Sequence, residues 1–221
     1  MSSGSFPIDL VLFGMIAAFL VLRLRSILGR RTGYERPAQP QRPAAEAPRG
    51  PVIEGRAEPV AQARPMPDAA SAAGRGLARI READRSFDPQ RFLEGAENAF
   101  RMIVAAFAAG DRGRLRPLLT DEIFQAFDGA ISQRETAGET QRTEIRNIAS
   151  ATIEEATLLG ALADITVRFV SDQINVTLGR DNNPVAGADA VTEITDIWTF
   201  ERSLGGAQAG PAWRLAAARS A

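Results

Sequence analysis

The sequence predicts an α+β domain in which three helices pack on a curved antiparallel sheet of about four strands. Apolar residues recur at helical spacing between residues 77 and 137, and they alternate with polar residues after residue 143. Turn signals divide both regions into short elements. Helices followed by strands are typical of α+β architecture, and a long bent strand suits a cone-shaped domain. A single transmembrane helix and a disordered linker are expected before this domain.

The composition limits the chemistry that the chain can perform. Its 221 residues include no cysteine and no histidine, and all 26 basic residues are arginines. Disulfides, His or Cys metal sites, Ser-His or Cys-His nucleophiles and Schiff-base lysines are therefore excluded. Only carboxylates, hydroxyls and backbone groups remain for catalysis, so we expect no enzyme activity, no metal and no cofactor.

The net charge of −1 hides an asymmetry between the two ends of the chain. Residues 1–86 hold 13 arginines against 8 acidic residues, and residues 87–221 hold 13 against 19. A nucleic-acid-binding protein more often concentrates positive charge on its folded domain, so no nucleic-acid partner is expected. The positive excess instead follows an apolar segment, where it can interact with anionic lipid headgroups.

The N-terminal segment, residues 1–31, is predicted to be a membrane anchor. With its apolar flanks, the run around Leu10–Leu22 reaches about 23 residues, or ~35 Å of helix, which is enough to cross a bilayer. Its apolar side chains are Leu10, Val11, Leu12, Phe13, Met15, Ile16, Phe19, Leu20, Val21 and Leu22. Arginines follow the run and none precedes it; those expected to bind lipid headgroups are Arg23, Arg25, Arg30 and Arg31. The positive-inside rule then predicts a single-pass protein of the bacterial inner membrane with its C-terminal domain in the cytoplasm. Peripheral or re-entrant attachment and an ordinary buried helix are the alternatives.

A linker is expected at residues 32–76, before a folded domain at residues 77–221. Residues 37–67 contain eight prolines and few large apolar side chains. Such a segment cannot form a core, and fully extended it would span ~95 Å. It is therefore interpreted as a spacer, although a proline-motif ligand for a partner is an alternative.

The predicted domain starts with helices. A short basic amphipathic helix over Leu77–Ala83 serves either as a lid on the domain or as a contact with anionic lipid or a partner groove. Asp88-Pro89 is a strong helix start, and that helix ends at Gly110. A short second helix is expected around Leu115, Leu118 and Leu119. A third opens at Thr120 and stops at Ala137-Gly138.

Strands follow from residue 143 onward. The expected strands cover residues 143–159, 163–178, 192–201 and 213–218, with a turn at Gly160 and a loop from Asn182 to Gly187. The apolar phase of the second strand slips by one residue, which predicts a β-bulge or bend around Ser171–Gln173.

Aromatic side chains are the candidate pocket or partner contacts. They are core residues in the simplest interpretation, and if the cone holds an open pocket they are expected to line it. These residues are Phe92, Phe100, Phe169, Trp198 and Trp213.

The carboxylates offer weaker candidates for chemistry. Asp164 and Asp196 lie in predicted strands and are expected to be exposed or to pair with Arg168 or Arg202. Asp181-Asn182-Asn183 with Asp189 fits no EF-hand spacing and is interpreted as a polar turn.

Six blocks of the chain, in order, closely resemble one family. They are FDPQRFLEGA (87–96), AFRMIVAAFAAGD (99–111), LRPLLT (115–120), FVSDQINVT (169–177), TDIWTFER (195–202) and WRLAAAR (213–219). The resemblance is to the alphaproteobacterial branch of the Tim-forty-four-like (Tim44-like) domain family and covers about residues 76–221. A mitochondrial relative in this family is the inner-membrane anchor of the protein-import motor.

The resemblance implies a cone-shaped fold similar to nuclear transport factor two, with an apolar pocket, in a membrane-bound adaptor. Mitochondrial members dock a DnaK-type chaperone onto a translocase and touch cardiolipin-rich membrane. The motifs do not identify the protein partner of the bacterial members; a translocase or DnaK-type chaperone is the candidate class, beside anionic lipids. The mitochondrial chaperone-recruiting region is replaced here by the anchor and linker, so chaperone recruitment cannot be carried over residue by residue. A cone-fold enzyme for small molecules is the alternative. A ribosome-binding assembly factor, as in a related branch, would require a more basic domain surface.

Overall fold

The structure is a computed structural model that describes residues 64–205 and 212–221. The predicted anchor, its arginine flank and the linker up to residue 63 lie outside the described residues. Across residues 64–205 and 212–221, none of the helices combines the length and the apolar character needed to cross a bilayer.

The helices come first in the chain, as predicted. They are α2 (Ala72–Ala83), α3 (Pro89–Ala109), the single turn α4 (Arg112–Leu115) and α5 (Asp121–Ala137). The Asp88 carboxylate caps α3 by accepting from the backbone N–H groups of Gln90 and Arg91, with Pro89 in the first turn. Gly110 and Gly138 end α3 and α5 in the left-handed conformation, with φ of 70° and 72°.

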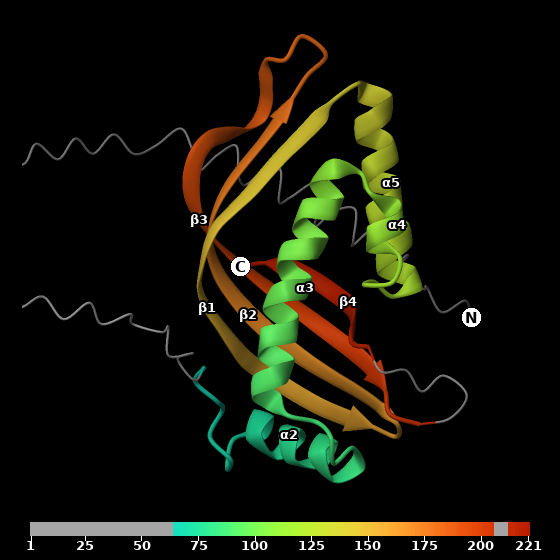
Figure 1. The fold of residues 1–221 in the computed structure, drawn as a ribbon, viewed down its shortest axis with the longest axis vertical. Coiled ribbons are helices and arrows are strands. Elements are labelled where there is room, and N and C mark those ends of the chain that lie inside the picture. Colours follow the sequence, from blue (N-terminus) through green and yellow to red (C-terminus); the bar gives the residue numbers. More distant parts are fainter. Residues whose placement is uncertain (1–63, 206–211) are drawn as a thin grey trace, which may run out of the picture.

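A four-stranded antiparallel sheet completes the domain. Its strands are β1 (Thr140–Leu159), β2 (Leu162–Leu178), β3 (Pro184–Ser203) and β4 (Arg214–Ser220), in the spatial order β1-β2-β3-β4. Figure 1 shows long, curved strands with α3 running along one face, α2 across the lower end, and α4 and α5 beside α3 near the upper end. The predicted α+β class, with helices packed on a four-stranded antiparallel sheet, is confirmed.

The core lies between the helices and the covered face of the sheet. Alternate residues of β2, from Ala163 through Ile165 and Val167 to Phe169, are fully buried there. Phe100 and Ile103 of α3 pack against them in the same cluster. The alternation predicted for this strand is therefore the pattern that buries one face of the sheet.

The first helix starts earlier than the sequence indicates. α2 begins at Ala72 rather than near Leu77, and Ser71 caps it by accepting from the Gly74 N–H. Gly76 lies so close to β1 that a Cβ on it would sit 1.8 Å from the Ala156 carbonyl oxygen. Small residues that looked like linker are thus the ones that let α2 approach the sheet.

The expected second helix is also shorter. α4 ends at Leu115, although Arg116 before Pro117 keeps helical backbone angles and donates its N–H to the Arg112 carbonyl. Leu118 and Leu119 lie outside it, and Leu119 instead forms a β-bridge with Leu215 of the last strand.

Two details of the sheet test the turn predictions. The phase slip is confirmed at a neighbouring position: Gln173 and Ile174 are both buried, and the β2–β3 register shifts between Gln173 and Asn175. Gly187 was expected in a loop but lies within β3 with φ of 75°. A Cβ there would lie 2.2 Å from the Asn175 carbonyl oxygen, so glycine allows the close approach of the two strands.

Candidate functional site

The five predicted aromatic residues pack together between α3 and the sheet. Phe100 stacks on Phe169 with ring centroids 4.6 Å apart and meets Trp198 edge-on at 4.7 Å. Phe92 contacts Trp213 at 4.9 Å. All but Trp213 are buried, and they belong to the hydrophobic core, where they contact one another and also Phe87 and Phe200. They act as core residues in this structure, and a role in contacting a ligand or partner stays a prediction.

The two strand carboxylates lie on opposite faces of the sheet. Asp164 alternates with the buried Ala163 and Ile165, so it points away from the helices, and partial burial raises the pKa of its carboxyl. Asp196 is paired with the buried Phe169 of β2 and lies two residues before Trp198, so it shares their face and points to the helix-covered side. An acid–base pair formed by these two groups is therefore excluded by the geometry.

The arginines expected near Asp164 have other partners. Arg168 pairs with Glu154 at 2.5 Å, and Arg202 pairs with Asp84 at 2.8 Å. Asp164 forms no ion pair with any residue that the structure describes.

A buried polar cluster on the covered face was not predicted. Ser171 is fully buried, Gln173 is 4% exposed, and the Gln173 amide donates to the Ser171 hydroxyl at 2.8 Å. The same amide lies 3.4 Å from the Asp196 carboxylate, which also accepts from Ser220 at 2.9 Å. Asn175 donates to the Gln173 carbonyl at 3.1 Å. The phase slip in the sequence indicated an irregularity near residues 171–173, but it did not indicate that buried polar side chains would lie there.

The polar turn after β2 behaves as expected. Asn183 donates its backbone N–H and its side-chain amide to the Asp181 carboxylate, which lowers the pKa of that carboxyl. Asp189 does not join this group, because it pairs with Arg142 at 2.9 Å.

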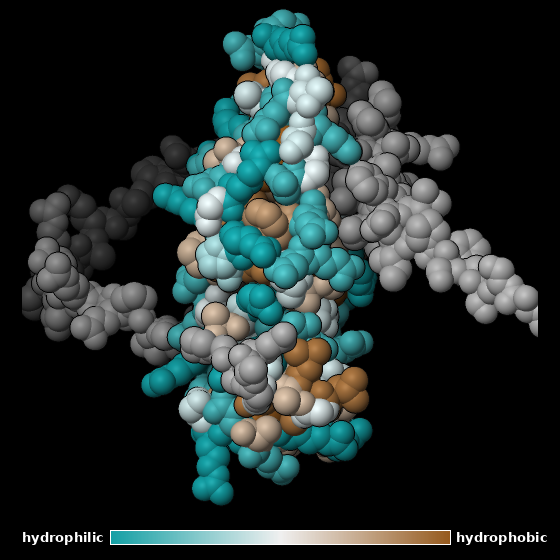
Figure 2. Space-filling view, turned by 90° about the vertical axis from the view of Figure 1, so that its right-hand side faces the viewer, coloured by the Kyte–Doolittle hydropathy of each residue, from teal (hydrophilic) through white to brown (hydrophobic). Residues whose placement is uncertain are grey.

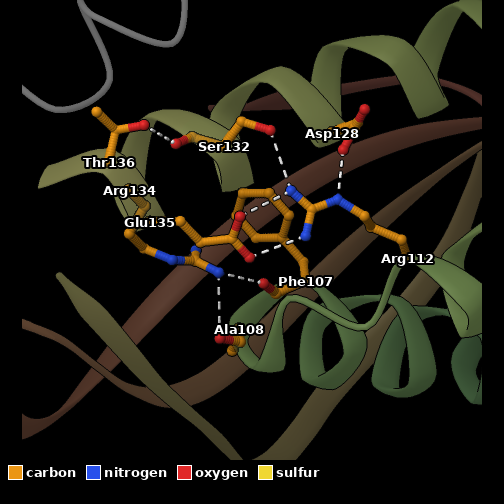
Figure 3. Close-up of polar contacts among 8 residues, drawn as sticks. All are labelled: Phe107, Ala108, Arg112, Asp128, Ser132, Arg134, Glu135 and Thr136. Atoms are coloured by element: carbon orange, nitrogen blue, oxygen red, sulfur yellow. Dashed lines mark hydrogen bonds and ion pairs between the residues drawn. The ribbon is translucent and has the colours of Figure 1, made fainter. Parts of the chain in front are cut away.

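Arginines tie α5 to the end of α3 in a network drawn in Figure 3. Arg112 donates to Glu135 at 2.8 and 3.0 Å, to Ser132 at 3.0 Å and to Asp128 at 2.5 Å. Arg134 donates to the last carbonyls of α3, those of Phe107 and Ala108. These contacts give the last carbonyls of α3 side-chain donors and fix α5 beside α3, so the network is structural.

One end of the domain is basic. The arginines of α2, of the turn after it and of the start of α3 are exposed, and none of them forms an ion pair in the described part of the chain. Arg81 and Arg91 interact with the Asp88 carboxylate at longer range. This basic tip consists of Arg75, Arg79, Arg81, Arg85 and Arg91. Most arginines elsewhere in the domain do have a carboxylate partner, as Arg116 and Arg146 do.

Apolar side chains are exposed at the same end. The hairpin between β1 and β2 leaves Leu159 81% and Leu162 36% exposed. It adjoins α2, since Gly76 approaches Ala156 near the end of β1. The side of the domain seen in Figure 2 is mainly hydrophilic, with apolar residues gathered near its lower end. The tip therefore combines positive charge with exposed leucines.

These features define an α+β domain whose sheet is covered by helices on one face, with a packed aromatic core and a basic tip. The Tim44-like domain matches residues 73–220, which is more than half of the chain. The chain therefore belongs to the Tim44-like domain family, and the resemblance drawn from the six sequence blocks is confirmed. The alphaproteobacterial branch stays a prediction.

Solved structures give partial overlaps. One is the intermembrane space region of the chloroplast protein ARC6, at 12% identity and a TM-score of 0.42, covering 58% of this chain and 95% of that chain. Another is a conserved protein from Planctomyces limnophilus DSM 3776, at 19% identity and a TM-score of 0.31, covering 57% and 94%. No curated protein matches the chain.

Proposed function

We propose that this protein is a membrane-anchored, non-enzymatic adaptor of the bacterial inner membrane. Its N-terminal segment holds it in the bilayer, the proline-rich linker spaces the Tim44-like domain from the anchor, and the domain works in the cytoplasm. The protein binds a partner through this domain in protein translocation or membrane-protein assembly. A translocase or a DnaK-type chaperone is the partner class that we propose.

The basic tip is the observation that carries this proposal. The linker enters the domain at this end, because residue 64 precedes α2. The tip arginines are exposed and form no ion pair among the described residues, so they are available to anionic headgroups, each contributing ~1 kcal/mol near the surface. Leu159 and Leu162 can add apolar contact at the interface.

Tethering and docking together give a mechanism without catalysis. The anchor raises the effective concentration of the domain near membrane partners, into the mM range for a short spacer. When the tip lies on the bilayer, the turn between β2 and β3 at the opposite end of the long axis points away from it (Figure 1). That orientation presents the far end of the domain to a cytoplasmic partner.

Energy transfer to a lipid dye tests the orientation. The chain has no cysteine, so Ala83→Cys at the tip and Val185→Cys near the β2–β3 turn can each carry one donor dye. We expect stronger transfer from position 83 than from position 185 in phosphatidylglycerol nanodiscs. The difference should shrink in phosphatidylcholine and in high salt, because exposed charges are screened.

Charge-reversal variants of equal size show whether lipid binding depends on the basic tip or only on the net charge of the domain. The combined change R79E with R81E should remove most of the preference for anionic lipid, and L159E should weaken it. R101E with R219E reverses two exposed arginines outside the tip and should leave the preference for anionic lipid unchanged. Equal transfer from positions 83 and 185 in both lipids would contradict the proposed orientation.

Small-molecule binding is a second candidate, supported by the buried Ser171–Gln173 pair beside Asp196. Such a polar cluster on an otherwise apolar face could orient a ligand. A metabolite screen by thermal shift should then give hits that Gln173→Leu removes. Retention of every hit in Gln173→Leu would reject this cluster as the binding site.

A further inference from the structure

The side of α3 that faces solvent holds an arginine from the segment before α2. The Arg64 guanidinium donates to both carboxylate oxygens of Glu97, at 2.5 and 2.9 Å, and lies 3.5 Å from Glu94. The Gln90 side-chain amide bonds the backbone of the same residue twice. It accepts from the Arg64 N–H at 3.2 Å and donates to the Arg64 carbonyl at 2.8 Å. We call Gln90, Glu94 and Glu97 the arginine clamp.

Local sequence explains this geometry. Residues four and three positions apart lie on one side of a helix, so Gln90, Glu94 and Glu97 form a single stripe on α3. Pro65 restricts Arg64 to an extended conformation, which leaves its N–H and carbonyl free to meet the flat amide of Gln90. Glu97 is the better-buried carboxylate, with a side chain 19% exposed against 54% for Glu94.

The contacts define what the clamp recognises. Two parallel hydrogen bonds to one carboxylate suit the guanidinium fork and no other side chain of this chain. The paired bonds to Gln90 require an extended backbone at that arginine. Pro65 and Met66 are exposed, so the clamp reads the arginine and its extended backbone rather than the residues after it. The ligand is therefore an arginine held extended by a following proline.

The same dipeptide recurs twice in the linker, at Arg36-Pro37 and Arg42-Pro43. We propose that the clamp also binds Arg42-Pro43, so that the linker has a second bound register with a shorter free tether. Arg42-Pro43 is favoured over Arg36-Pro37, because Glu35 would bring a third acidic side chain to a stripe that already has two. The inference deepens the adaptor proposal and rests on it, because tether length matters only for a domain held at a membrane.

Polymer statistics give the length of the free tether and the relative occupancy of the two bound registers. The free tether after residue 31 spans at most ~100 Å when Arg64 is bound, and ~30 Å when Arg42 is bound. Closing the longer loop makes the Arg42 register roughly tenfold less occupied. Arg64 is therefore the main occupant, and its loss should expose the second register.

Spin-label distances in the full chain test the exchange. Labels at Ala44→Cys and Asn98→Cys, in phosphatidylcholine nanodiscs, report whether Arg42 lies at the clamp. We expect a short-distance population that rises severalfold in Arg64→Ala, with the occupancy ratio above setting an upper limit of about tenfold. Arg42→Ala in the Arg64→Ala background should remove it, and so should Glu97→Gln. Glu94→Gln, which changes the exposed carboxylate, should have the smaller effect.

Two outcomes would overturn the proposal. One is the absence of a short-distance population in Arg64→Ala, with the melting temperature showing that the domain is folded. The other is a population that disappears when labelled chains are diluted with unlabelled ones, since the ligand would then come from a second copy. Neutral lipid and the absence of a partner keep this test separate from the adaptor proposal, which anionic nanodiscs test.

Discussion

Arg202 near the end of β3 donates to the carboxylate of Asp84, the residue that ends α2, at 2.8 Å. The two residues are 118 positions apart, and their side chains are only 18% and 16% exposed. The ion pair therefore fixes the C-terminal end of α2 to the sheet. It also holds in place the helix that carries most of the basic tip.

Asp84→Asn should destabilise the domain by about 1.5–3 kcal/mol at pH 7, because a hydrogen bond between charged groups is lost. Hydrogen bonds from Ser86, and then Arg202, lower the pKa of the Asp84 carboxyl. Its contribution is thus complete above the ordinary carboxyl pKa and is lost as the pH falls through the lower folded value. Urea unfolding should show the variant and wild type converging in acid.

Glu144→Gln is the matched control for Asp84. It removes an exposed ion pair with Arg146, which should cost less than about 1 kcal/mol. An equal loss of stability in the two variants would contradict the structural role given to Asp84.

Gly76→Ala should lower the free energy of unfolding by about 2 kcal/mol or more, because the new Cβ would lie 1.8 Å from the Ala156 carbonyl oxygen and push α2 away from β1. Gly95→Ala, with no atom within 4 Å of its Cβ, should stabilise α3 by about 0.5–1 kcal/mol. Thermal unfolding of both variants tests the close packing of α2 on β1. A stabilising Gly76→Ala would show that the helix sits farther away.

Asp164→Asn should stabilise the domain at neutral pH. Burial raises the pKa of this carboxyl in the folded state. The free energy of unfolding of the wild type therefore falls as the pH rises from the ordinary carboxyl pKa through the raised pKa of the folded state. Below the ordinary carboxyl pKa both states are protonated, and the two proteins should unfold alike. A melting-temperature series against pH checks the sign, and a variant less stable at pH 7 would contradict it.

Phe100→Ala should lower the free energy of unfolding by about 3–5 kcal/mol, because Phe100 is fully buried and packs on Phe169 and Trp198. Met102→Ala, on the same helix but 50% exposed, should change stability by less than about 0.5 kcal/mol. Denaturant unfolding compares them directly. Similar small effects would indicate an open pocket around Phe100 instead of a packed core.

Local signals predicted several helix ends correctly, but not the start of α2, the end of α4 or the start of β3. Asp88-Pro89, Gly110 and Gly138 act through their own backbone geometry, so their roles can be recognised without knowing what packs against them. The slip near Gln173 was visible for the same reason, since strand periodicity is local.

Features set by distant partners escaped the sequence. Arg64 looked like part of a linker because its ligands, Gln90 and Glu97, lie 26 and 33 residues away. Gly76 and Gly187 looked like linker and loop residues, but each allows a close approach to a neighbouring strand. No periodicity or capping rule encodes such contacts.

Membrane association of the full chain is the central claim, and sodium carbonate extraction of cell membranes tests it most directly. We expect the intact protein in the washed membrane pellet, and a variant lacking residues 10–22 in the supernatant. Recovery of the intact protein only in the soluble fraction would contradict the account.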